Sequence, residues 1–140
     1  MSRGDDSGSG AAAEAAAVMA QLPALAAADA WLIARGRWLT AAFLIECGAV
    51  PFHGAIAEGR LVALERGPQL MRAWRFAIRA PASSWLRFWQ PVPAPGWHDL
   101  LALVKHGEAR LEGDLHPLMA NLQYFKDLLA LPRRLEGGAA

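Results

Sequence analysis

The chain has 140 residues, which is enough to bury the core of one ordinary domain and too few for two. Hydrophobic residues make up 54% and charged residues 19%, so the composition excludes a disordered or fibrous chain. The net charge is +1, and the single cysteine, Cys47, excludes an internal disulfide and a zinc site built from several thiolates. We therefore expect one folded domain, with a reducing cytoplasm as its simplest location.

The N-terminal part predicts a tail followed by helices. Residues 1–10 are rich in glycine and serine, so we expect a disordered tail. Residues 11–22 are rich in alanine and residues 25–39 have helical spacing, so both stretches predict helices. This helical region, residues 11–39, either packs on the domain or mediates self-association. The start lacks the basic patch and apolar core of a secretion signal, and the most apolar window is too short to span a membrane.

From Thr40 the periodicity changes to that of strands. Apolar side chains alternate along residues 43–46 and 52–57, the Gly-containing stretch 57–60 predicts a tight turn, and residues 61–65 return as a strand. In the run RAWRFAIR, residues 72–79, Trp, Phe and Ile alternate with Arg and Ala, which predicts a strand with one wet face. Four successive strands with short connections imply an antiparallel meander.

The middle of the chain is aromatic and rich in proline. Pro81 opens a predicted short helix, ASSWLRFWQ, and the following PVPAPG is a stiff extended connector. Residues 97–107, WHDLLALVKHG, resume the helical period and end at a glycine.

The stretch HGEARLEGDLHPL, residues 106–118, concentrates acids and histidines. Its alternation over EARLE predicts a strand with a charged outer face, and Asp114 stands where a helix cap belongs. Apolar residues from Leu115 to Leu129 recur at offsets 0, 3, 4, 7, 10 and 14, which predicts one long amphipathic helix. These acids are therefore interpreted as a strand edge and a cap rather than as a catalytic or metal site.

Sequence motifs for catalysis are absent. The four histidines fall on different predicted elements, and no HExxH, GxSxG or glycine-rich phosphate loop occurs. We therefore predict no catalytic residue, no metal site and no cofactor. Arginine is in excess between Arg60 and Arg87. These arginines either bind phosphates or anionic lipid headgroups, or form a solvated face of the sheet. They do not indicate nucleic-acid binding.

Two segments resemble the sterol carrier protein 2 family in its small, stand-alone bacterial form. HDLLALVKHGEARLEGDLHPLMANLQYFKDLLAL has the family's order of apolar helix, glycine, short strand ending in Gly-Asp and final apolar helix. VPFHGAIAEGRLVALERGP resembles the β-hairpin of bacterial members. The resemblance places a sterol-carrier-like domain at residues 40–132, followed by a flexible tail at residues 133–140.

The resemblance implies an α+β fold whose five-stranded antiparallel or mixed sheet is covered on one face by helices. It also implies a hydrophobic tunnel between sheet and helices that holds a fatty acyl chain, a sterol or a similar lipid, without catalysis. A lipid, a transient membrane contact and an enzyme of lipid metabolism are the implied partners. By position, the candidates for the tunnel lining are Phe76, Ile78, Trp85, Phe88, Trp89, Leu101, Met119, Leu122 and Phe125. The candidates for holding a headgroup are Arg75, Arg79 and Arg87.

The chain departs from the family pattern in SSWLRFWQPVPAPGWHD, residues 83–99, which narrows the tunnel or fills it. An alternative function therefore stays open. In it the protein keeps the fold with a filled cavity, and an exposed Trp-rich segment from Trp85 to Trp97 docks a protein partner.

Overall fold

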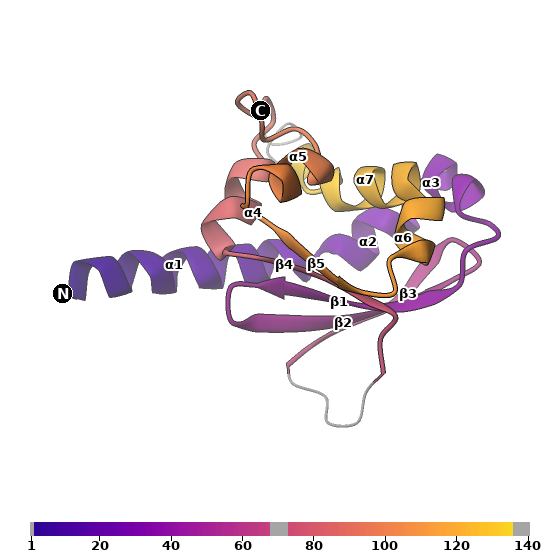
Figure 1. Ribbon diagram of the computed structural model, residues 1–140, viewed down its shortest axis with the longest axis horizontal. Helices are drawn as coiled ribbons and strands as arrows, with labels where there is room; N and C mark the ends of the chain where they lie inside the picture. Colours follow the sequence, from indigo (N-terminus) through magenta and orange to yellow (C-terminus); the bar gives the residue numbers. More distant parts are fainter. Residues whose placement is uncertain (1, 68–72, 136–140) are drawn as a thin grey trace.

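The computed structural model describes the backbone of residues 2–67 and 73–135 and the side chains of residues 10–67 and 73–135. Within these residues the chain forms seven helices and five strands (Figure 1). In chain order these are α1 (Ser2–Met19), α2 (Leu22–Ala27), α3 (Ala30–Arg35), β1 (Ala41–Cys47), β2 (Val50–Ala57), β3 (Arg60–Arg66), β4 (Phe76–Ala80), α4 (Ala82–Phe88), α5 (Leu100–Lys105), β5 (Arg110–Gly113), α6 (His116–Ala120) and α7 (Leu122–Ala130).

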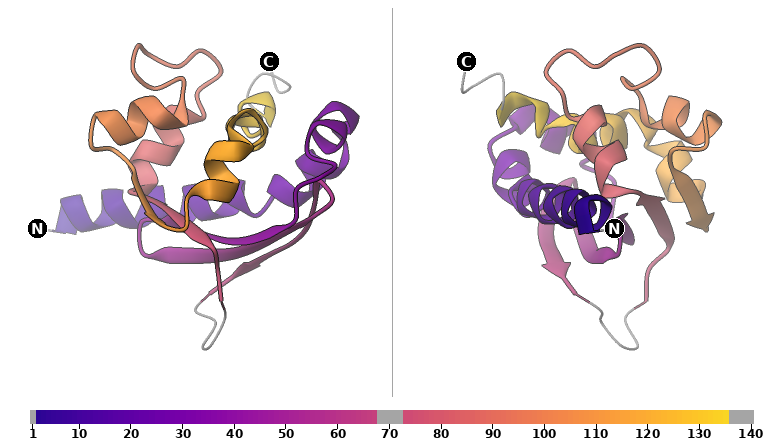
Figure 2. Two further views of the ribbon diagram at one scale, coloured as in Figure 1. Left: turned by 45° about the vertical axis from the view of Figure 1, so that its right-hand side comes forward. Right: turned by 90° about the vertical axis from the view of Figure 1, so that its left-hand side faces the viewer.

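The five strands form one mixed sheet in the order β3-β2-β1-β4-β5. The hairpins β1–β2 and β2–β3 are antiparallel, as predicted, and β4 pairs antiparallel with β5. The expected meander is wrong at its fourth strand, because β4 lies beside β1 and runs parallel to it. The helices lie on one side of the sheet (Figure 2), so the predicted fold class is confirmed.

Strand β4 lies between β1 and β5 and is largely buried. Phe76, Ala77 and Ile78 are all fully buried, whereas the sequence pattern predicted a wet face that included Ala77. Strand β4 pairs with β1 on one side and with β5 on the other, so its backbone is hydrogen-bonded along both edges.

The N-terminal helices pack on the domain rather than standing apart. Helix α1 contacts α4 and β1, helix α2 contacts β3, and Ala15, Met19 and Leu22 belong to the main hydrophobic core. Helix α1 already begins at Ser2, in contrast to the disordered tail expected over residues 1–10. A helix that is already nucleated gains one hydrogen bond per added residue, so the alanine-rich segment can extend toward the N-terminus.

The helix expected over residues 25–39 is broken. Helix α2 ends at Ala27, and α3 begins at Ala30 because the Asp29 carboxylate accepts a hydrogen bond from the Leu32 amide at 3.0 Å. By length and composition alone, the stretch Gly10–Ala27 is apolar enough to cross a membrane, and 28% of it is buried in the structure.

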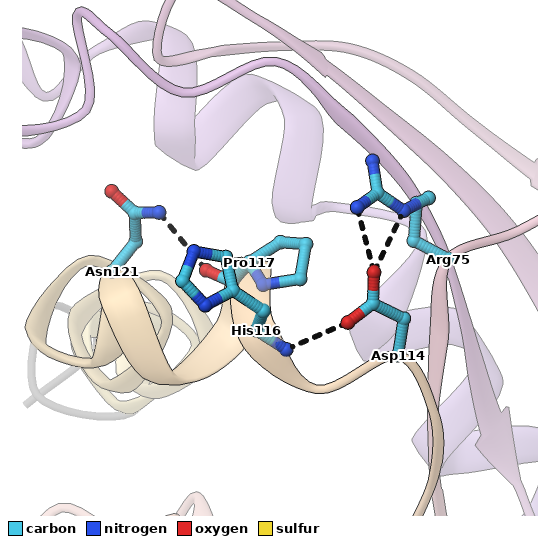
Figure 3. A network of polar contacts seen from close by, with 5 residues as sticks. All are labelled: Arg75, Asp114, His116, Pro117 and Asn121. Atoms are coloured by element: carbon cyan, nitrogen blue, oxygen red, sulfur yellow. Dashed lines mark hydrogen bonds and ion pairs between the residues drawn. The ribbon is translucent and has the colours of Figure 1, made fainter.

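The Gly113-Asp114 step joins the last strand to the last helices (Figure 3). The Asp114 carboxylate accepts from the Arg75 guanidinium at 2.7 Å and from the His116 amide at 3.1 Å, and these bonds hold its pKa below the usual value. The predicted cap thus lies one residue before Leu115, which is the N-cap of α6. Gly113 has a φ of +89°, and a Cβ there would lie 2.6 Å from the Arg75 carbonyl oxygen. Glycine is therefore required where β5 leaves the sheet.

The long helix predicted after Asp114 is two helices. Asn121 has non-helical backbone angles, and its side-chain amide donates to the Pro117 carbonyl at 2.9 Å, so α6 ends before it and α7 begins after it (Figure 3). The flexible tail predicted from residue 133 is wrong for residues 133–135, which form a helical turn with Arg133 and Arg134 in contact with the domain. Residues 136–140 lie outside the described part.

Candidate ligand-binding site

An aromatic layer lies between the sheet and helix α7. Phe43 of β1 and Phe76 of β4 stack with ring centroids 5.7 Å apart. Phe125 of α7 meets both rings edge-on, at 5.8 Å from Phe43 and 5.2 Å from Phe76. Such edge-to-face contacts are the preferred aromatic geometry, so sheet and helix are in direct contact here.

Helix α4 adds a second aromatic group to the same core. Trp85 lies 6.0 Å from Phe88 and 5.5 Å from Trp89, between ring centroids. The Trp85 indole N–H donates to the Glu46 carbonyl of β1 at 2.9 Å, and that of Trp89 donates to the Leu129 carbonyl of α7 at 2.8 Å. Helix α4 is thus tied to the sheet through one indole and to α7 through the other.

Tyr124 ties α7 to the tip of the β2–β3 hairpin. Its hydroxyl donates to the Gly59 carbonyl at 2.7 Å, and burial raises the pKa of this phenol to about 12. Glu58 and Gly59 both have positive φ, which confirms the predicted tight turn. A Cβ on Gly59 would lie 2.5 Å from the Ile33 carbonyl oxygen, so only glycine allows the hairpin tip to lie this close to α3.

Most of the lining candidates come together in this layer. The ones that are buried in the main core are Phe76, Ile78, Trp85, Phe88, Trp89 and Phe125. The others are peripheral: Leu101 and Leu122 are half-buried outside the core cluster, and Met119 is 44% exposed. Sequence reasoning missed Phe43 and Tyr124, although the alternation of Phe43 with Ile45 on a predicted strand signalled the first.

The three headgroup candidates do not share a site. Arg75 pairs with Asp114, and Arg87 lies 4.5 Å above the ring of Trp97. Arg79 lies between Glu46 and Glu112, at 2.8 Å from the latter, and these hydrogen bonds raise its already high pKa. Each guanidinium thus has a partner of its own.

A surface cleft of about 400 Å³ adjoins Arg79. Its lining includes Glu46, Glu108, Arg79 and Arg110, so acidic and basic side chains are equal in number and the cleft offers no excess of positive charge to an anion. Cys47, which lies nearby in sequence, is fully buried, and burial raises the pKa of its thiol to about 12. The thiol packs in the hydrophobic core, as predicted.

Arg133 is a structural residue that sequence reasoning missed. Its guanidinium donates to the carbonyls of Phe88 and His98, both at 2.8 Å, and lies 4.6 Å from the Phe88 ring centroid. It thereby joins the two ends of the proline-rich connector, and its burial lowers its pKa. No local sequence pattern predicts this contact, because its partners lie 35 and 45 positions away in the chain.

The exposed Trp-rich segment proposed for protein docking is not exposed at its tryptophans. Trp85 and Trp89 are 1% and 4% exposed, and Trp97 is half-buried against Arg87. The exposed large side chain of this segment is Val92. The indole hydrogen bonds explain the difference, because they draw the aromatic helix into the core.

The chain is thus an α+β domain with a five-stranded mixed sheet that helices cover on one face. Comparison with solved protein structures supports this fold. No family model and no curated protein sequence matches the chain. Several solved structures do match it, and three of them share 16–19% sequence identity with the chain.

One of these structures is described as a UbiJ-SCP2 ubiquinone synthesis protein. It matches with a TM-score of 0.55 and 19% identity over 85% of this chain and 90% of its own. A sterol carrier protein 2 matches with a TM-score of 0.59 and 17% identity over 83% and 92%. A conserved hypothetical protein from Thermus thermophilus, described as a possible sterol carrier protein, matches with a TM-score of 0.51 and 16% identity over 79% of each chain. The chain therefore has the sterol carrier protein 2 fold.

Proposed function

We propose that the protein binds or carries a hydrophobic ligand between its sheet and its helices, without catalysing a reaction. The ligand class is a fatty acyl chain, a sterol or a similar lipid. A cytoplasmic location, transient contact with a membrane and cooperation with an enzyme of lipid metabolism belong to the same proposal.

The observation that carries the proposal is the aromatic layer in a domain with the fold of sterol carrier protein 2. The layer is aromatic, and its side chains come from β1, β4, α7 and the α4 region. Burial of a lipid methylene contributes about 0.8 kcal/mol, so a site of this chemistry needs few polar contacts to hold a lipid. One similar structure is named for ubiquinone synthesis, which adds quinone-bearing isoprenoid lipids to the ligand classes worth testing.

The tunnel itself is a prediction. In the described chain the rings of Phe43, Phe76 and Phe125 are in contact, so a ligand must separate α7 from the sheet or displace a ring. We propose that the six buried lining candidates form the wall of the opened site, while Leu101, Met119 and Leu122 lie at its margin.

Native mass spectrometry of protein purified from cells tests the proposal, followed by organic extraction and identification of what is bound. A lipid in near-stoichiometric amount is the expected result. Delipidated protein should then gain about 2.7 kcal/mol of stability at a ligand concentration of 100 times Kd. Protein that carries no lipid and is stabilised by no acyl, sterol or quinone ligand would refute the proposal.

The ring contacts favour a second candidate, an interaction module with the same fold and a filled cavity. Its docking surface would not include Trp85 or Trp89, because both are buried. Intrinsic fluorescence separates the two functions, since a lipid shifts the emission of the purified protein and a filled module responds only to its partner.

A further inference from the structure

Two tryptophans outside the aromatic layer are almost fully exposed. Trp31 on α3 is 87% exposed, and Trp38 in the turn after α3 is 86% exposed. Tryptophan has the largest apolar side chain. Single small apolar residues are common on protein surfaces, whereas two exposed indoles close together in the sequence are unusual. Neither indole takes part in the core contacts described above.

Arginines join the two tryptophans into one surface. Trp31, Ala34, Arg35 and Arg37 line a shallow cleft of about 350 Å³. The Arg37 guanidinium lies 5.5 Å from the Trp38 ring centroid and donates to the Ala34 carbonyl at 2.9 Å. These five residues, Trp31, Ala34, Arg35, Arg37 and Trp38, are called the tryptophan–arginine patch.

The patch carries positive charge that is only weakly compensated. Within the described residues Arg37 has no carboxylate partner, and Arg35 approaches Asp127 only to 3.6 Å, with both side chains about half exposed. The neighbouring Asp29 is already paired with Arg134 at 3.0 Å. Asp29 and Asp127 are thus outnumbered by Arg35, Arg37 and Arg134, which leaves an excess of positive charge near the two indoles.

The patch lies beside the helix that covers the candidate site. Trp31 and Arg35 also line a cleft of about 430 Å³ that reaches α7 through Ala130 and Leu131, and Leu32 and Leu131 in this cleft belong to the hydrophobic core. Helix α3 lies at one end of the molecule, next to α7 and away from the N-terminal end of α1 (Figure 1). A membrane that meets the patch would therefore meet the α3–α7 edge of the ligand layer.

We propose that the tryptophan–arginine patch docks the protein on the surface of bilayers that contain anionic phospholipids. Indoles favour the level of the lipid headgroups, and guanidinium groups pair with lipid phosphates. The inference rests on the proposed function, because a hydrophobic ligand enters and leaves a carrier where the carrier meets a membrane.

Vesicle co-sedimentation tests the patch with the full chain. The wild type should bind vesicles that contain phosphatidylglycerol and bind much less to phosphatidylcholine alone, and added salt should weaken the binding. The double variant Trp31→Ala/Trp38→Ala should lose at least tenfold in affinity, and Arg35→Gln and Arg37→Gln should each lose about fivefold. Val92→Ser is the matched control, because Val92 is 87% exposed in another segment, and it should bind like the wild type.

The inference is overturned if the wild type ignores anionic vesicles or if the double tryptophan variant binds them like the wild type. The inference is also overturned if the patch variants bind vesicles normally and lose only the binding of a protein partner. Ligand binding to the delipidated variants, measured without vesicles, separates this inference from the proposed function. If the variants lose vesicle binding but still bind ligand, the proposed role of the patch is confirmed. If the wild type binds vesicles but no ligand, membrane docking stands and the proposed carrier function is refuted.

Discussion

Replacing Phe125 with alanine tests whether the aromatic layer is closed in the ligand-free protein. The Phe125 ring is fully buried and contacts the rings of Phe43, Phe76 and Tyr124 at centroid distances of 5.2–5.8 Å. Loss of a buried side chain of this size costs about 1.5–3 kcal/mol in transfer alone. The cavity left by a packed ring raises the total to about 3–5 kcal/mol, or roughly 10–18 °C in Tm for a chain of this length.

Equilibrium unfolding of the delipidated protein in urea, followed by tryptophan fluorescence and circular dichroism, measures this cost. Leu122→Ala on the same helix is the control, because Leu122 is half-buried outside the core cluster and should cost about 1 kcal/mol. An apolar cavity of this kind stays dry, so benzene should stabilise Phe125→Ala and not the wild type. A loss below about 1.5 kcal/mol would contradict the closed layer and indicate that Phe125 already faces an open space.

Three further substitutions test the contacts that frame the layer. Tyr124→Phe leaves the buried Gly59 carbonyl unpaired and should lower the free energy of unfolding by about 1–3 kcal/mol in urea titrations. Asp29→Ala removes the α3 cap and should cost about 1 kcal/mol at neutral pH. The folded-state pKa of Asp29 is lowered, chiefly by the Leu32 amide, so this contribution is complete above the unfolded value near 3.9 and disappears as pH falls through the folded value. Unfolding curves of wild type and variant should therefore converge in acid. Gly113→Ala forces a Cβ toward the β4 backbone at positive φ and should cost about 1–3 kcal/mol, whereas unchanged thermal stability would refute the close approach.

The elements that rest on local chemistry are the ones that the sequence predicts well. The alternation in β1 to β3, the tight turn at Glu58-Gly59 and the cap at Asp114 each depend on residues within a few positions of one another. The breaks at Asp29 and Asn121 are local too, but their polar side chains compete with an otherwise continuous helical pattern. Apolar periodicity alone does not register that competition.

The pairing of β4 depends on distant residues and could not be predicted in the same way. Short connections favour neighbouring antiparallel strands, whereas β4 pairs in parallel with β1, more than thirty positions earlier in the chain. The site shows the same division. Large apolar residues of the site were predicted because of their size. Tyr124 was not predicted, because its hydrogen bond to Gly59 spans 65 positions of the chain. Met119 was predicted as a lining residue by its position under the family resemblance, and it is 44% exposed on α6.

A closed layer and a carrier function are compatible if helix α7 moves. Two buried hydrogen bonds hold α7, from Tyr124 to Gly59 and from Trp89 to Leu129, whereas the Trp85 indole holds α4 to the sheet independently. Breaking both bonds costs roughly 2–6 kcal/mol. At about 0.8 kcal/mol per methylene, an acyl chain must bury about three to eight methylenes before it offsets that cost.

The affinity of delipidated protein for a series of saturated fatty acids should therefore show a threshold in chain length. Below the threshold no binding is expected, and above it each methylene should tighten Kd about fourfold until the space is filled. Tyr124→Phe removes one of the two restraints, so its threshold should lie at a shorter chain than that of the wild type, whereas Val92→Ser, outside the layer, should leave the threshold unchanged. Calorimetric titration across the series measures both, and equal thresholds for the wild type and Tyr124→Phe would show that the ligand does not enter by displacing α7.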